Sequence, residues 1–229
     1  MSSPVTVLVG ATGGIGSATA LRLAATGHRL HLLGRDADRL AATAAEVGAV
    51  STAVVDARDV AAVGAAVEAV ASAEGRLDGA ASFVGSLLLK AAHQTSADEW
   101  DDVLATNLTS AFALVRAAAP RMRATGGSIV LMSTAIARTG MANHEAIAAA
   151  KAGVEGLVRS AASTYGATGV RVNAVAPGLT RTRLTERVTA SPAQAELSAQ
   201  LHALGRIGEP EDVAGAVAWL LDPATTWVT

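Results

Sequence analysis

The residues near the start of the chain that could do chemistry are glycines. Residues 10–16 read GATGGIG and follow an apolar run at residues 5–9. Residues 17–25 (SATALRLAA) form a good helix sequence, so the glycines join a strand to a helix N-terminus. Backbone N–H groups there lack intrahelical partners, the helix dipole favours an anion, and glycine lets a pyrophosphate approach the main chain. The stretch predicts a phosphate-binding loop, and the alternative is a plain buried strand and turn.

A cation follows the second predicted strand. Residues 28–33 (HRLHLL) read as that strand, Gly34, Arg35 and Asp36 close it, and residues 37–46 read as a helix. In such a βαβ unit the residue at the end of the second strand meets the adenosine ribose, where a cation suits a 2′-phosphate. Arg35 therefore predicts that NADP(H) is preferred over NAD(H), although Asp36 beside it weakens the preference. The alternative is a solvated arginine after a strand.

Composition excludes several classes of function. The net charge is −2 and the cations are dispersed, so we expect no nucleic-acid partner. There is no cysteine, and the five histidines lack a zinc-binding spacing, so we expect no metal site. The N-terminal apolar run is too short for a signal peptide or a membrane span, which predicts a cytoplasmic protein with no membrane partner.

The remaining elements alternate along the whole chain. Further strands are predicted at 51–55, 78–84, 127–132 and 170–175, and further helices at 60–73, 98–116, 146–165 and from the 205–213 segment to residue 221. This alternation predicts one α/β domain over residues 1–229, a doubly wound parallel sheet flanked by helices on both faces. Residues 183–204 read as a polar, helical flap over the mouth of the site.

Several motifs in this order resemble those of the short-chain dehydrogenase/reductase family. They are the glycine spacing of residues 10–16, Asp56-Ala57, Gly85, Trp100 with Asn107 and Leu108 seven and eight residues later, Lys151 within AAAKAG, and Pro177-Gly178. The family has a Rossmann-type fold. Two departures are Val9, where the family has Thr, and residues 82–85 (SFVG), where it has Asn-Asn-Ala-Gly. The last strand and the C-terminal tail of the family are expected to lie beyond Thr229.

The resemblance implies a set of residues that bind NADP(H). Asp56 and Ala57 lie beneath the adenine ring, although an Asp after a strand is also a helix-start signal. Leu179 and Thr182 contact the nicotinamide carboxamide. The full set is Gly10, Thr12, Gly13, Gly14, Ile15, Gly16, Arg35, Asp56, Ala57, Val84, Gly85, Lys151, Pro177, Gly178, Leu179 and Thr182.

The resemblance also implies a catalytic group, in which this chain differs at one position. The family's Tyr protonates the substrate carbonyl oxygen, and a Lys four residues later lowers the Tyr pKa. Lys151 matches the Lys, which places the Tyr position at Ile147, a residue that cannot donate a proton. Asn107 matches the Asn of the proton relay. The Ser position falls on Thr134, with Ser133 immediately before it, and either hydroxyl could serve.

Three accounts of the missing Tyr stay open. In the first, His144 is the substitute donor, because it shares a helical face with Ile147 and Lys151 if the helix begins that early. Glu145 points about 100° away from His144 and is a poorer candidate. The alternative for His144 is a solvated loop histidine. In the second account the protein binds the nucleotide without turnover, and in the third it is an enzyme of altered chemistry.

The expected partners are small molecules and further copies of the chain. An alcohol or carbonyl compound is the expected substrate. Helices 98–116 and 146–165 carry small and apolar residues on more than one face, which would leave a sizeable apolar patch in water. The family buries these helices in a two-fold interface, so we expect a homodimer or homotetramer.

Overall fold

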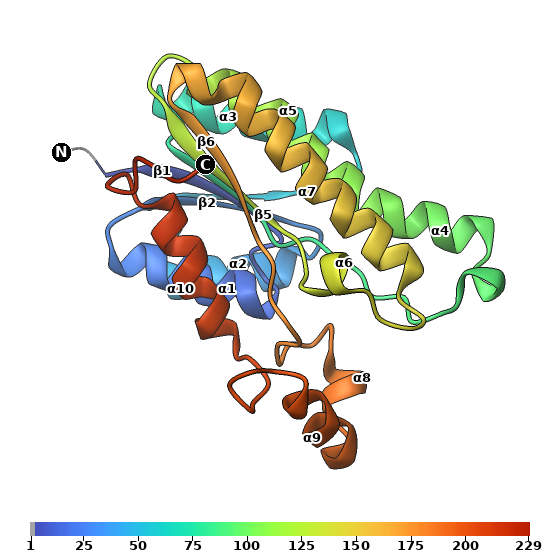
Figure 1. Cartoon of the computed structure of the whole chain (residues 1–229). Coiled ribbons are helices and arrows are strands. Elements are labelled where there is room, and N and C mark those ends of the chain that lie inside the picture. Colours follow the sequence, from blue (N-terminus) through green and yellow to red (C-terminus); the bar gives the residue numbers. More distant parts are fainter. Residues whose placement is uncertain (1–2) are drawn as a thin grey trace.

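The computed structural model describes residues 3–229 as six parallel strands between two layers of helices (Figure 1). The strand order in the sheet is β3-β2-β1-β4-β5-β6. The strands are β1 (Val5–Val9), β2 (Arg29–Gly34), β3 (Ser51–Val54), β4 (Gly79–Ser82), β5 (Gly127–Met132) and β6 (Val170–Val175). The predicted doubly wound parallel fold is confirmed.

The strand order reverses direction beside β1. The chain builds β2 and β3 on one side of β1 and then crosses to place β4 on the other side. Parallel sheets of this kind bind ligands outside the carboxyl ends of the strands, at this switch point. The loops after β1 and β4 are therefore where a site is expected.

Each face of the sheet packs on its own helices. Helices α1 (Gly14–Ala25), α2 (Ala37–Val47) and α10 (Pro210–Leu221) cover one face, and α3 (Val60–Glu74), α5 (Ser110–Met122) and α7 (Glu145–Tyr165) cover the other (Figure 1). Successive strand side chains point to opposite faces, so Val7 and Val9 join the second layer while Leu8 joins the first. Both faces are buried, which explains why β1 is a continuous apolar run.

Two predicted helices differ from the structure. Helix α1 begins at Gly14, two residues before the last glycine of the loop, so the glycines form its first turn. The helix expected over 98–116 is built from α4 (Ala97–Leu104), a π-helical turn (η2, Ala105–Thr109) and α5. This combined stretch is long and apolar enough to span a membrane by length and composition, but half of its most apolar window is buried in the fold.

The segments after β6 complete the structure. The flap is less helical than predicted, because within residues 183–204 only α8 (Glu186–Thr189) and α9 (Pro192–Gln200) are helical. After α10 the chain returns beside β6, where Val172 N–H donates to Thr229 Oγ1 at 3.0 Å. Short helical elements are η1 (Ala92–Gln94), α6 (Ile136–Thr139) and η3 (Gly166–Thr168).

Candidate active site

The glycine-rich loop is shaped by close backbone contacts. Gly10 has a φ of 75°, and a Cβ there would lie 3.1 Å from Val84 Cγ2. A Cβ on Gly16 would lie 2.5 Å from Gly10 O, so the helix can approach the strand this closely only with glycine. Gly13 is the N-cap of α1 and supplies no side-chain cap. The first-turn N–H groups are thus open to an anion beside the loop after β4.

Two arginines follow β2 near this loop. Arg35 is exposed directly after β2. Asp36, which the sequence placed as a competitor, is the N-cap of α2 and accepts from Arg39 N–H at 3.0 Å. The Arg39 guanidinium donates to Thr12 O. Sequence reasoning missed Arg39, although its position four residues after Arg35 on a predicted helix was a usable signal.

Asp56 follows β3 and forms an ion pair. Its carboxylate accepts from Arg58 Nη2 at 2.7 Å, and these hydrogen bonds from Arg58 lower the pKa of Asp56. The helix-start role considered for Asp56 belongs to Asp59, which caps α3 by accepting from Ala61 and Ala62 N–H. Ala57 is buried beside it.

Asn107 and Lys151 meet at the carboxyl end of β4. A Cβ on Gly85 would lie 3.2 Å from Asn107 Oδ1 and 3.7 Å from Lys151 Nζ. Asn107 is 1% exposed, donates from Nδ2 to Ser86 Oγ at 2.9 Å, and accepts at Oδ1 from Ser86 N–H. Its Nδ2 also donates to Val103 O at 3.0 Å, across the π-helical turn. The turn therefore directs this amide toward the end of β4.

Lys151 is a buried ammonium with unused donors. Its Nζ donates to Met132 O at 2.9 Å, and within residues 3–229 this is its one hydrogen-bond acceptor. The side chain is 7% exposed, and burial lowers its pKa from an ordinary 10.5 to about 8. Two N–H groups of a buried ammonium are thereby available to a ligand.

The two hydroxyls after β5 face different partners. Ser133 Oγ donates to Glu155 Oε1 at 2.9 Å, and Glu155 also accepts from Arg138 Nε at 2.8 Å. The Arg138 hydrogen bond holds the pKa of Glu155 below its ordinary value. Thr134 Oγ1 makes only a long 3.4 Å hydrogen bond to Pro177 O and is the hydroxyl with freedom to turn. Sequence reasoning missed Glu155, because a glutamate inside a helix reads as solvent-exposed.

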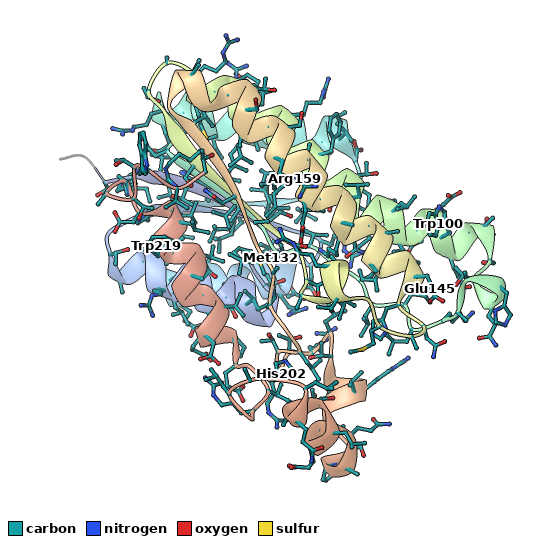
Figure 2. The ribbon with its side chains drawn as sticks, viewed as in Figure 1. Trp100, Met132, Glu145, Arg159, His202 and Trp219 are labelled. Carbon is teal, nitrogen blue, oxygen red and sulfur yellow. The ribbon has the colours of Figure 1, made fainter. Side chains whose placement is uncertain are left out.

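The three residues considered for the Tyr position and the substitute donor lie at the start of α7. Ile147 is 4% exposed, one turn before Lys151. His144 is the N-cap residue of α7, and its Nδ1 lies 2.7 Å from Ala142 O, so Nδ1 carries the proton of the neutral ring. The ring is thus held toward the preceding loop. The next residue, Glu145, is exposed at the outer end of α7 (Figure 2).

The loop at residues 177–182 links the two halves of the site. A Cβ on Gly14 would lie 3.1 Å from Thr182 Cγ2, so Thr182 lies against the glycine-rich loop. At the other end, Pro177 O accepts from Ala135 N–H at 3.0 Å, just after β5. Between them, Leu179 N–H donates to His202 Nε2 of the flap at 3.0 Å.

A parallel sheet with an open glycine cradle at its switch point and a buried lysine at the next strand end defines a dinucleotide-binding protein. Residues 10–229 match the family model described as enoyl-(acyl carrier protein) reductase. The chain belongs to the short-chain dehydrogenase/reductase family, whose members similar to it are dehydrogenases and reductases acting on alcohols and carbonyls.

Individual relatives match over almost their whole length. D-threitol dehydrogenase of Mycolicibacterium smegmatis is 33% identical, covering 100% of this chain and 89% of the relative. Cis-4-hydroxycyclohexanecarboxylate dehydrogenase of Sinomonas cyclohexanicum is 37% identical, covering 98% of this chain and 91% of the relative. A solved short-chain dehydrogenase/reductase of Mycobacterium ulcerans superposes with a TM-score of 0.95 at 31% identity, covering 100% of this chain and 87% of that one.

The family implies a nicotinamide cofactor, and the residues present fit one. The cradle at Gly10 and Gly16 has no room for side chains, and the N-terminus of α1 has no side-chain cap. The buried Lys151 ammonium has donors to spare for ribose hydroxyls. These features suit an anionic, hydroxyl-bearing dinucleotide.

Proposed function

We propose that the protein is an NADP(H)-dependent oxidoreductase that interconverts an alcohol and its carbonyl, with Ile147 in place of the family's Tyr. The observation that carries the proposal is the approach of Lys151 Nζ and Asn107 Oδ1 to Gly85, beside the glycine cradle. The buried Lys151 ammonium, with one hydrogen-bond acceptor in the described residues, costs folding free energy unless a ligand uses its remaining donors. The position matches the ligand crevice of a doubly wound sheet.

The bound nicotinamide supplies the redox chemistry, as a donor or acceptor of hydride. In the proposed arrangement the first-turn N–H groups of α1 hold the pyrophosphate. Arg35 and Arg39 hold a 2′-phosphate, which Asp36 does not oppose because it caps α2. Lys151 donates to the nicotinamide ribose, and Thr182 binds the carboxamide.

The substrate oxygen is assigned to Thr134. Its hydroxyl has a weak present partner, whereas Ser133 is committed to Glu155. Asn107 holds a water for the proton relay, with Ser86 fixing the orientation of its amide. The substrate is a small hydroxyl- or carbonyl-bearing molecule, a class consistent with the names of the relatives.

His144 is the proposed proton donor. The bond between Nδ1–H and Ala142 O fixes the ring tautomer, which leaves Nε2 as the nitrogen that can carry a second proton to the substrate. This nitrogen reaches the substrate oxygen when the loop before α7 folds inward over the nicotinamide. Burial of Ile147 provides an apolar wall at the usual acid position.

The experiment measures cofactor binding and turnover separately. Titration of NADPH and NADH by fluorescence gives two dissociation constants, and oxidation of NADPH is then followed with a panel of ketones and quinones. Binding with measurable turnover supports the proposal. Binding without turnover, together with gain of ketone reduction in Ile147→Tyr, identifies a nucleotide-binding protein that does not catalyse. Failure to bind either nucleotide contradicts both the proposed oxidoreductase and the alternative of a nucleotide-binding protein that does not catalyse.

We also propose an oligomeric state and a cellular location for the protein. The outer face of α3, α5 and α7 carries Phe112, which is 45% exposed beside a hollow of about 620 Å³. An exposed aromatic on a face of small residues favours association of two copies through these helices, as a homodimer or within a homotetramer. The proposed location is the cytoplasm.

A further inference from the structure

Two residues of the flap, residues 183–204, contact the loop 177–182: Thr185 near its start, which accepts from Thr182 N–H at 3.1 Å and donates to Thr180 O at 2.5 Å, and His202 near its end. His202 Nε2 accepts from Leu179 N–H at 3.0 Å, and its Nδ1 donates to Ser198 O at 2.7 Å. A backbone N–H can only donate and a carbonyl can only accept, so the ring is the neutral Nδ1–H tautomer. One ring thereby connects α9 to the loop after β6 (Figure 2).

The ring also fills the space left by a glycine. A Cβ on Gly178 would lie 2.8 Å from His202 Cδ2 and closer still to Nε2, and the nearest atoms to that Cβ all belong to this ring. Gly178 is absent from the positive-φ residues of the described chain, so its backbone conformation suits alanine. The obstacle to a side chain at this position is therefore His202.

The flap buries little apolar side-chain area. Ala195 is its one buried hydrophobic residue in the described structure, whereas Leu197, Leu201 and Leu204 are 64%, 72% and 82% exposed. With so little apolar area buried, the flap belongs to the parts of a fold that open at low cost. Thr185 holds the start of the flap, so the hydrogen bond of His202 has a large share in keeping the α9 end closed.

The loop connects this contact to the site. Pro177 O accepts from Ala135 N–H and from Thr134 Oγ1, and Thr182 lies against Gly14. Movement at Leu179 would therefore reach the Thr134 hydroxyl on one side and the glycine-rich loop on the other.

We propose that His202 is a positioning residue that latches the flap onto the 177–182 loop and so sets substrate and cofactor retention. This role rests on the proposed function for its catalytic consequence, but the latch itself is defined by geometry. Loss of the latch raises the rate at which the flap opens and raises KM and the NADPH dissociation constant more than it lowers kcat.

Two substitutions separate the two hydrogen bonds of the ring. His202→Gln retains an acceptor near the position of Nε2, and His202→Asn retains a donor near the position of Nδ1. Gln200→Ala, at an exposed flap position, is the matched control. Tryptic cleavage after the exposed Arg183 and Arg187 reports flap opening without requiring activity.

We expect His202→Asn to raise the cleavage rate about 3- to 10-fold, with His202→Gln much closer to the native rate. Gly178→Ala should raise cleavage in the native background and add little to His202→Ala, because the ring that it strikes is gone. Equal cleavage in His202→Asn and Gln200→Ala, or the same effect of Gly178→Ala in both backgrounds, would overturn the latch. Absence of NADPH binding would contradict the proposed function and leave the cleavage result decisive for the latch.

Discussion

The Arg39 guanidinium donates a hydrogen bond to the Thr12 carbonyl, which ties the first turn of α2 to the glycine-rich loop. Arg35 lies four residues earlier at the exposed end of β2, and the Asp36 carboxylate between them is engaged as a helix cap. The two cations border the place proposed for the 2′-phosphate of the cofactor. A free carboxylate that would favour a 2′-hydroxyl is lacking at these three positions.

NADPH should bind more tightly than NADH by about 1–3 kcal/mol, because a charge-assisted contact to the 2′-phosphate is available. Arg35→Ala should lower NADPH affinity by a similar amount and leave NADH affinity nearly unchanged. Fluorescence titration measures both constants, with Arg123→Ala, at the exposed end of α5, as the control. Equal dissociation constants for the two nucleotides in the native protein would refute this preference.

Carbonyl reduction should be weak, because the loop that carries His144 must fold inward before its ring reaches the substrate oxygen. His144→Ala should reduce kcat about 10²-fold or more, and His93→Ala, in the exposed η1 turn, should not. Steady-state rates of the native protein and of the two variants measure both effects. If His144→Ala leaves a measurable native rate unchanged, a water held by Asn107 or the Thr134 hydroxyl supplies the proton instead.

Lys151→Met should stabilise the cofactor-free protein at pH 7 by about 1–3 kcal/mol while weakening cofactor binding. Burial lowers the Lys151 pKa from 10.5 to about 8, so between these values the unfolded chain binds the proton that the folded chain has released. The free energy of unfolding of the native protein therefore rises from pH 8 to 10.5, and the advantage of the variant shrinks. Urea unfolding at several pH values tests this, and a constant advantage over that range would argue against burial as the cause.

The native protein should have the mass of a dimer or tetramer by light scattering at micromolar concentration. Phe112→Glu should shift it toward smaller species, because a charge on an apolar helix face disfavours its burial. Leu197→Glu, on the exposed flap, is the control. A monomeric native protein would contradict the interface on α3, α5 and α7.

The fold was predictable because its signals are local. Strands buried on both faces read as apolar runs, and the β5 and β6 boundaries agree with the prediction to the residue. The glycine-rich loop was equally predictable from the sequence, because its glycine spacing follows from the close contact of Gly16 with Gly10 O. The strands and the glycine-rich loop could be predicted because each is determined by residues close together in the sequence.

The missed features depend on partners distant in the sequence. Glu155 is buried because the fold brings Ser133 and Arg138 to it, and no local pattern distinguishes it from a surface glutamate. The π-helical turn around Asn107 likewise follows from the hydrogen bonds of its amide. Periodicity alone predicted one regular helix there.

The π-helical turn also holds an extra residue between α4 and α5. Because the turn is wider than an α-helical turn, it accommodates this residue without rotating the two helices against each other. Deleting Thr106 would therefore leave a continuous helix of ordinary hydrogen bonding in which α4 and α5 keep their faces, but without the wide turn that directs the Asn107 amide toward the end of β4. At this point of the chain the deletion of a single residue would alter the proposed site, even though it would change neither charge nor hydrophobicity appreciably.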